Sequence, residues 1–194
     1  MNTAVARFDR KVNQMSQRIE STGMKSISSF IDTSLQWVQP SAFKPMYELR
    51  SGDECILTLR FPKWFSTTVR VEAAEGRWEI KRVGFWKQRI EIQREGDHLP
   101  FATCTMQGWT NNKGTVELPK GRRVSITANC WTSRYDVATP TGEPMMVLKC
   151  KIGLKPHAEL TLHPKGTSYP ELPWIAALVW YLVLLARRRA AHAG

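Results

Sequence analysis

The side chains of this sequence best suited to binding chemistry are basic, and they fall at turns or at outward-facing positions of expected strands. There are seven of them: Lys81, Arg82, Lys87, Arg89, Arg122, Arg123 and Arg134. An arginine guanidinium donates two parallel hydrogen bonds to a phosphate group, and both residue types attract anions. These seven residues are therefore our candidates for binding a phosphate-bearing ligand.

Two of the candidates belong to a pattern that occurs twice. The segments 86–92 and 131–137 share the sequence W-x-x-R-φ-acid-φ, where φ is an apolar or aromatic residue, and the copies stand 45 residues apart. Self-similarity at this period indicates a sheet built from repeated hairpin units. In each copy the arginine, Arg89 or Arg134, stands two residues before a carboxylate. Both arginines can therefore also be ordinary surface charges that pair across strands.

No other side chains form a catalytic or metal-binding pattern. The four cysteines have no C-x-x-C spacing, and strand periodicity places them on apolar faces, where a free cysteine behaves as a small hydrophobe. They are Cys55, Cys104, Cys130 and Cys150. The histidines fall at turns or in the tail without a nucleophile or metal-type partner nearby; they are His98, His157, His163 and His192. We therefore expect no enzymatic activity, no cofactor and no metal.

The net charge is strongly positive but dispersed. The chain of 194 residues has 28 basic and 17 acidic side chains, a formal charge of +11 and an isoelectric point near 9.8. Residues 1–45 carry +3, and Arg187, Arg188 and Arg189 carry another +3, which leaves +5 for the rest of the chain. Such a surplus favours anionic partners. Because it is diffuse, it fits a solvated surface as well as a binding face.

The elements expected to hold these residues are short strands. Between residues 46 and 163 apolar residues recur with period two, and turn residues interrupt them about every 8–12 positions. Strands fit the segments 47–49, 55–61, 69–71, 78–80, 90–92, 99–106, 114–118, 123–130, 133–138, 144–152 and 158–162. Ten to twelve short strands at hairpin spacing indicate an antiparallel sandwich or barrel.

Residues 1–38 have the apolar periodicity of helices. A first stripe steps by three and four residues, through Val5, Phe8, Val12, Met15 and Ile19, and a second follows Gly23, through Ile27, Phe30, Ile31 and Leu35. Such a helix can pack on the domain, pair as a short coiled coil, or lie on a membrane surface as a basic amphipathic helix. All three alternatives stay open at the sequence level.

A helix with apolar side chains on every face is expected over residues 172–186, and three arginines complement the negative end of its dipole. Such a helix is buried in protein or in lipid. Fifteen residues rise only about 22 Å, short of the roughly 30 Å of hydrocarbon in a bilayer. Barrels of about eleven strands or more can hold a central helix, and small inward residues such as Ala102 and Ala128 would leave room. We therefore expect this helix inside the domain, with a membrane anchor as the alternative.

In three respects the sequence resembles the tubby C-terminal-like superfamily, which includes tubby domains, phospholipid scramblases and plant LURP-one-related proteins. These are the short alternating strands, the segment I-K-R-V-G-F-W at 80–86 and the closing apolar helix. The resemblance covers roughly residues 46–189 and implies a twelve-stranded barrel around a central hydrophobic helix. The tubby branch implies binding of anionic lipid or phosphate. A scramblase would add a palmitoylated Cys-rich stretch and a Ca²⁺-binding acidic run, and this sequence has neither.

We therefore predict a mainly β protein in three parts. An amphipathic helical extension and linker occupies 1–45, and a barrel of roughly twelve antiparallel strands occupies 46–189, with its central helix at 172–189. A flexible tail follows at 190–194. The oligomeric state is open, because the N-terminal helix can pair.

The predicted function is non-enzymatic binding of anionic lipid headgroups or other phosphate-bearing ligands at a basic surface. The alternative is a tail-anchored or scramblase-like membrane protein that uses residues 172–186 as a membrane segment. Nucleic-acid binding ranks below both, because several of the eight tryptophans occupy core-like positions. Residues 1–22 lack the continuous apolar core of a signal peptide, which predicts a cytoplasmic protein, either peripheral to a membrane or anchored to it by the C-terminus.

Overall fold

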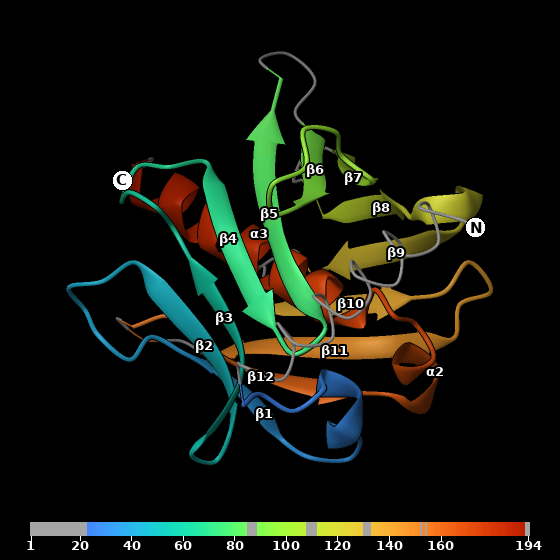
Figure 1. The fold of residues 1–194 in the computed structure, drawn as a ribbon, viewed down its shortest axis with the longest axis horizontal. Helices are drawn as coiled ribbons and strands as arrows, with labels where there is room; N and C mark the ends of the chain where they lie inside the picture. Colours follow the sequence, from blue (N-terminus) through green and yellow to red (C-terminus); the bar gives the residue numbers. More distant parts are fainter. Residues whose placement is uncertain are drawn as a thin grey trace, which may run out of the picture.

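The computed structural model describes residues 23–84, 89–107, 112–129, 133–151, 153 and 155–192. In this part of the chain twelve antiparallel strands form a closed barrel, and one long helix runs through its interior (Figure 1). The predicted fold class, a barrel of roughly twelve strands around a C-terminal apolar helix, is confirmed. The helix predicted within residues 1–22 lies outside the described residues.

Each strand pairs with the strands before and after it in the sequence, and β1 pairs with β12 to close the barrel. The strands are β1 (Leu35–Val38), β2 (Met46–Ser51), β3 (Glu54–Arg60), β4 (Thr68–Ala73), β5 (Gly76–Val83), β6 (Arg89–Arg94), β7 (Ala102–Gln107), β8 (Lys113–Glu117), β9 (Arg123–Ala128), β10 (Arg134–Ala138), β11 (Pro144–Lys151) and β12 (His157–Leu162). The helical elements are η1 (Ile27–Phe30), η2 (Pro119–Gly121), α2 (Pro164–Thr167) and α3 (Leu172–His192). Since sequence neighbours are sheet neighbours, every second connection emerges at the same end of the barrel.

Alternation of side chains turns one face of each strand toward the barrel interior. In β9, Val124, Ile126 and Ala128 are buried, and the residues between them are exposed. Small residues stand on the inner wall of β7 as well, where Ala102 and Cys104 are buried. These short side chains leave space in the interior for a helix.

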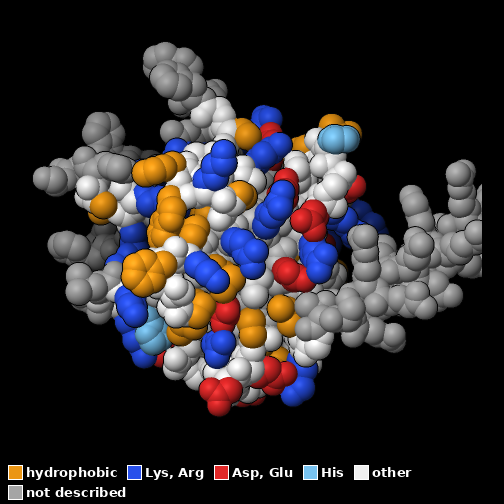
Figure 2. Space-filling view, turned by 60° about the vertical axis from the view of Figure 1, so that its left-hand side comes forward, with side chains coloured by type: hydrophobic (Ala, Val, Ile, Leu, Met, Phe, Trp, Pro, Cys, Tyr) orange, Lys and Arg blue, Asp and Glu red, His pale blue; other side chains and the backbone are white. Residues whose placement is uncertain are grey.

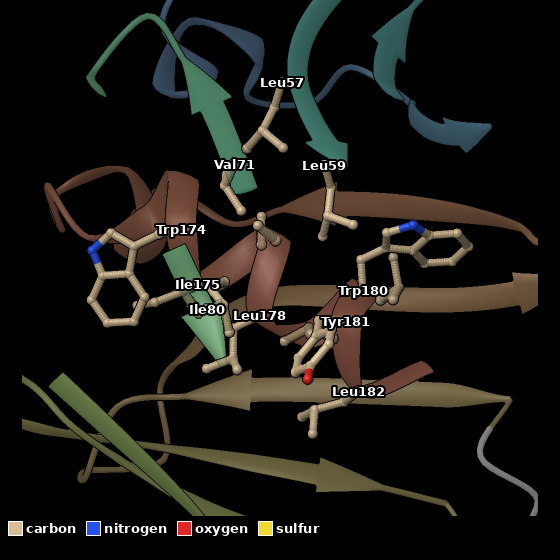
Figure 3. Packing of buried hydrophobic residues seen from close by; sticks show 14 of the residues in the cluster. Leu57, Leu59, Val71, Ile80, Trp174, Ile175, Leu178, Trp180, Tyr181 and Leu182 are labelled. Atoms are coloured by element: carbon tan, nitrogen blue, oxygen red, sulfur yellow. The ribbon is translucent and has the colours of Figure 1, made fainter. Parts of the chain in front are cut away.

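Helix α3 fills that space. It is buried from Leu172 to Leu185, and its side chains pack against the wall on all sides (Figure 3). Trp180 stacks on Trp37 of β1, with ring centroids 5.3 Å apart, and meets Tyr47 of β2 edge-on at 5.8 Å. The helix is therefore the core of the barrel. Within the described part of the chain, no helix is long and apolar enough to cross a membrane.

The prediction of helix up to residue 38 is wrong for the described residues. Only Ile27–Phe30 forms a helical turn, and Leu35–Val38 is strand β1, which joins β12 to β2. The barrel therefore begins before residue 46, the predicted boundary. Leu35 fits a helical stripe, but Leu35 and Trp37 also alternate as in a strand, and both are completely buried. β1 pairs with a strand on each side, and Trp37 stacks on Trp180 of α3. These tertiary contacts override the helical preference of the local sequence.

The central helix is also longer than predicted. Helix α3 continues to His192, so residues 190–192, predicted as flexible tail, are helical. The last turns of the helix are tied to the barrel, because Arg187 Nη2 donates to the carbonyl of Gly153 at 2.7 Å. The guanidinium of Arg188 likewise donates to the connection between β3 and β4, at the carbonyl of Ser66. Residues 193 and 194 lie outside the described residues.

The connection from β12 to α3 depends on a glycine. Gly166 in α2 packs against β11, and an added Cβ would overlap the carbonyl oxygen of Met145 and lie 3.1 Å from its carbonyl carbon. Because these backbone atoms cannot rotate away, Gly166→Ala is expected to lower the free energy of unfolding by about 1–3 kcal/mol, measured by urea denaturation. Gly114→Ala is the control, since its Cβ would meet the flexible side chain of Met106, at 2.6 Å from Sδ. Equal losses in both variants would contradict this account.

Candidate functional site

The six described candidate residues are spread over the barrel and do not converge on one site; Lys87 lies outside the described residues. Arg122 forms an ion pair with Glu171, just before α3, and its guanidinium lies over the ring of Tyr169 at 5.6 Å. Arg123 forms an ion pair with Glu117 at 3.3 Å. Carboxylates therefore engage both arginines, at the end of the barrel where α3 begins.

Three further candidates are also paired. Lys81 and Arg89 both bind Glu91, at 3.4 and 2.7 Å, and Arg134 binds Asp136 at 2.7 Å. Glu91 is only 7% exposed; burial raises the pKa of its carboxyl, but the hydrogen bonds from Arg89 and Lys81 outweigh this effect and leave the pKa below its ordinary value. The arginine pairs form between residues two apart on one strand. Each of the three basic groups therefore faces a carboxylate, and Lys81 and Arg89 share that of Glu91.

Arg82, near the end of β5, is different. It lines a pocket of about 690 Å³ at the end of the barrel where α3 terminates. The other lining residues are Tyr47, Trp64, Phe65, Thr67, Pro156, Leu184, Leu185, Arg187, Arg188, Arg189 and Ala191. Apolar and cationic side chains therefore share one concave surface.

Segments far apart in the sequence build this pocket. The connection 61–67 between β3 and β4 passes beside the last turns of α3 (Figure 1), and the connection between β11 and β12 meets the same turns. Arg188 Nη1 donates to the carbonyl of Ser66 at 3.0 Å, and its guanidinium lies 3.9 Å from the ring centroid of Phe61. These contacts hold the end of the helix and the connection 61–67 in one arrangement.

Two of the pocket's guanidiniums lie near Tyr181, a buried residue of α3. The Tyr181 hydroxyl donates to the carbonyl of Thr67 at 2.5 Å. Burial raises the pKa of Tyr181 to about 12, although the charges of Arg82 and Arg188 act in the opposite direction. The phenol therefore stays neutral at physiological pH and does not compensate the positive charge of the pocket.

The two ends of the barrel differ in charge. None of the described residues that line the pocket is acidic. The sequence of the six connections at this end also contains no Asp or Glu; they are 39–45, 61–67, 84–88, 108–112, 129–133 and 152–156. The connections at the opposite end contain six acidic residues. Figure 2, in which the side that carries the C-terminus is turned forward, shows hydrophobic side chains gathered among Lys and Arg.

The described cysteines offer no readily ionised thiol. Cys104 is fully buried, as predicted, whereas Cys55 and Cys150 are only half-buried, and Cys130 lies outside the described residues. Burial raises the pKa of Cys104 to about 12 and that of Cys150 to about 11. Within the described ranges, no three His, Cys, Asp or Glu side chains come together in a way that could hold a metal ion.

Comparison with protein-family models, curated proteins and solved structures finds no match to this chain. Of the pocket residues, sequence reasoning selected only Arg82. It assigned the arginines at 187–189 to the helix dipole, and it gave no role to Trp64 and Phe65. The signal that could have found them is the lack of acidic residues in every second connection.

Proposed function

We propose that this protein is a non-enzymatic binding protein that recognises anionic lipid headgroups, or other phosphate-bearing groups, in the pocket at the end of α3. We call this end of the barrel, whose six connections contain no Asp or Glu, the cationic end. The observation that carries the proposal is that Arg82, Arg188 and Arg189 line a pocket with no carboxylate among its described residues. Its volume of about 690 Å³ is typical of ligand sites, which range over about 300–1,000 Å³.

An anion in this pocket would meet positive charges that are free to attract it. Arg82, Arg188 and Arg189 form no ion pair with any described residue. The carbonyl and aromatic ring that Arg188 contacts are neutral. Leu184 and Leu185 supply apolar walls, which lower the local dielectric and strengthen the attraction. The helix end contributes roughly half a negative charge, and the arginines outweigh it.

The architecture supports a wider part of the proposal, that the chain is a tubby-like protein. The resemblance stated above implies a twelve-stranded barrel around a central hydrophobic helix, and this barrel has that arrangement. We place such a protein in the cytoplasm, peripheral to a membrane. Because α3 fills the barrel from Leu172 to Leu185, the apolar segment has a role as its core, which favours this proposal over a tail-anchored or scramblase-like protein.

The test is binding to phosphatidylcholine vesicles with and without phosphatidylserine, measured by co-sedimentation. Arg82→Gln with Arg189→Gln is the informative variant, because neither side chain holds the fold through an ion pair to a described residue. Each basic residue near an anionic surface contributes about 1 kcal/mol, so we expect binding to fall about thirtyfold. Wild-type binding should also weaken as salt rises from about 0.1 M to about 1 M, because the Debye length falls from about 10 Å to about 3 Å.

The matched control is Arg77→Gln with Arg123→Gln, which removes the same charge at the opposite end of the barrel. Both residues are paired there, with Glu72 at 2.6 Å and Glu117 at 3.3 Å. This variant should bind vesicles almost as the wild type does. If the two double variants bind equally well, or if the wild type ignores phosphatidylserine, the pocket is not the site.

A further inference from the structure

Large hydrophobic side chains are exposed mainly at the cationic end of the barrel. Among the described residues, four are strongly exposed: Phe43 by 90%, Trp64 by 48%, Phe65 by 96% and Leu99 by 80%. The first three lie in connections at this end, and only Leu99 lies at the other. The two connections that carry the aromatic residues touch, since Phe61 N donates to the carbonyl of Pro45 at 2.9 Å.

These aromatic residues stand among lysines and arginines. Lys44 follows Phe43 and Lys63 precedes Trp64, and both lysines are exposed. Trp64 and Phe65 also belong to the lining of the pocket, beside its arginines. Lysine is depleted at protein–protein interfaces, whereas aromatic and basic side chains together are typical of surfaces that enter the headgroup region of an anionic membrane.

The connection that carries Trp64 and Phe65 is held in place before any partner binds. Ser66 N donates to the carbonyl of Lys63 at 3.0 Å, and the Ser66 hydroxyl donates to the carbonyl of Thr68 at 2.9 Å. The Ser66 carbonyl in turn accepts from Arg188. The exposure of Phe65 is therefore a property of an ordered turn, and presenting it to a partner costs little ordering entropy.

We infer that the barrel docks end-on on an anionic bilayer, with Trp64 and Phe65 inserted between the headgroups and the acyl chains. The exposed lysines and the pocket arginines then lie at headgroup level, where their charge complements that of the lipid. This inference rests on the proposed function and names its partner as a bilayer surface. In this orientation the pocket opens toward the membrane, so a headgroup enters it without its lipid leaving the bilayer.

The experiment uses a double variant that carries both Trp64→Ser and Phe65→Ser. Its binding is compared with that of the arginine variant of the pocket and of a matched control. Vesicles of phosphatidylcholine and phosphatidylserine are the probe. Removing each inserted aromatic ring should weaken binding about tenfold, so the double variant should lose about a hundredfold. Its salt dependence should stay as in the wild type, because no charge has changed, whereas the Arg82→Gln, Arg189→Gln variant should show a weaker salt dependence. Leu99→Ser, an exposed residue at the opposite end, should bind as the wild type does.

The outcomes separate the inference from the proposed function. If the aromatic variant binds vesicles normally while the arginine variant does not, end-on insertion is overturned and the headgroup pocket stands. If the aromatic variant loses binding and the arginine variant does not, the headgroup pocket fails, and docking through Trp64 and Phe65 stands without it. If the aromatic variant has a lower sedimentation coefficient than the wild type in the absence of lipid, the patch is a contact between copies of this chain, and the inference is wrong.

Discussion

Replacing Trp180 with alanine is expected to lower the free energy of unfolding by about 3–5 kcal/mol. The indole is completely buried in the barrel, stacked on Trp37 and flanked by Tyr47. Its removal leaves a cavity, and the wall cannot collapse into it, because every strand is hydrogen-bonded on both sides in a closed sheet. The loss is measured by guanidinium chloride denaturation, as a lower midpoint at an unchanged slope.

A conservative variant isolates the role of volume. The Nε1 atoms of Trp180 and Trp37 are both buried without a hydrogen-bond partner among the described residues. Trp180→Phe therefore breaks no hydrogen bond and keeps an aromatic ring against Trp37, so we expect a loss of about 1 kcal/mol. If the alanine and phenylalanine variants are equally stable, α3 does not form the core that the structure describes.

The barrel and its central helix were predictable because both patterns are dominated by burial. Buried and more exposed residues alternate along β9 and β4, because one face of each strand points into the barrel. This alternation can be recognised in the sequence without knowing which strands pair. Helix α3 was recognisable as interior because its buried segment is apolar on every side and too short for a bilayer.

The closing strand was not predictable in the same way. β1 has only four residues, and Leu35, one of its two buried side chains, continues a spacing that also fits a helix. β1 is a strand because it pairs with β12, which follows more than a hundred residues later in the sequence. Trp37, for example, lies opposite Ala158. A local pattern carries no information about such a partner, so the predicted domain boundary fell too late.

The candidate site was predicted only in part, for a related reason. The repeated sequence pattern indicated that Arg89 can pair with Glu91, but outward position on a strand does not reveal that Lys81, on the neighbouring strand, binds the same carboxylate. The pocket arginines at the end of α3 meet the connection 61–67 only in the folded chain: Arg188 and Ser66, which share a hydrogen bond, are 122 positions apart. Tertiary structure therefore decides which charges are free.

Removing residues 172–194 is expected to abolish folding and give insoluble protein. The deleted segment buries fourteen consecutive residues, Leu172 to Leu185, inside the barrel. A buried Leu, Ile or Val contributes about 1.5–3 kcal/mol, so the lost burial exceeds the whole stability of a typical domain, about 5–15 kcal/mol. An empty barrel would expose its inner wall to water and associate with other copies.

The matched control is a chain that ends at Ala186. It keeps the whole buried segment of α3 and loses the arginines of the last turns, with the hydrogen bond from Arg188 to Ser66. We expect this shorter chain to fold, with a strand-rich circular dichroism spectrum and a lower unfolding midpoint, and to lose most of its binding to phosphatidylserine vesicles. A soluble, cooperatively unfolding product from the longer deletion would show that the barrel does not need its helix. Insolubility of both chains would instead mean that the last turns of α3 hold the barrel together, beyond any part they have in binding an anion.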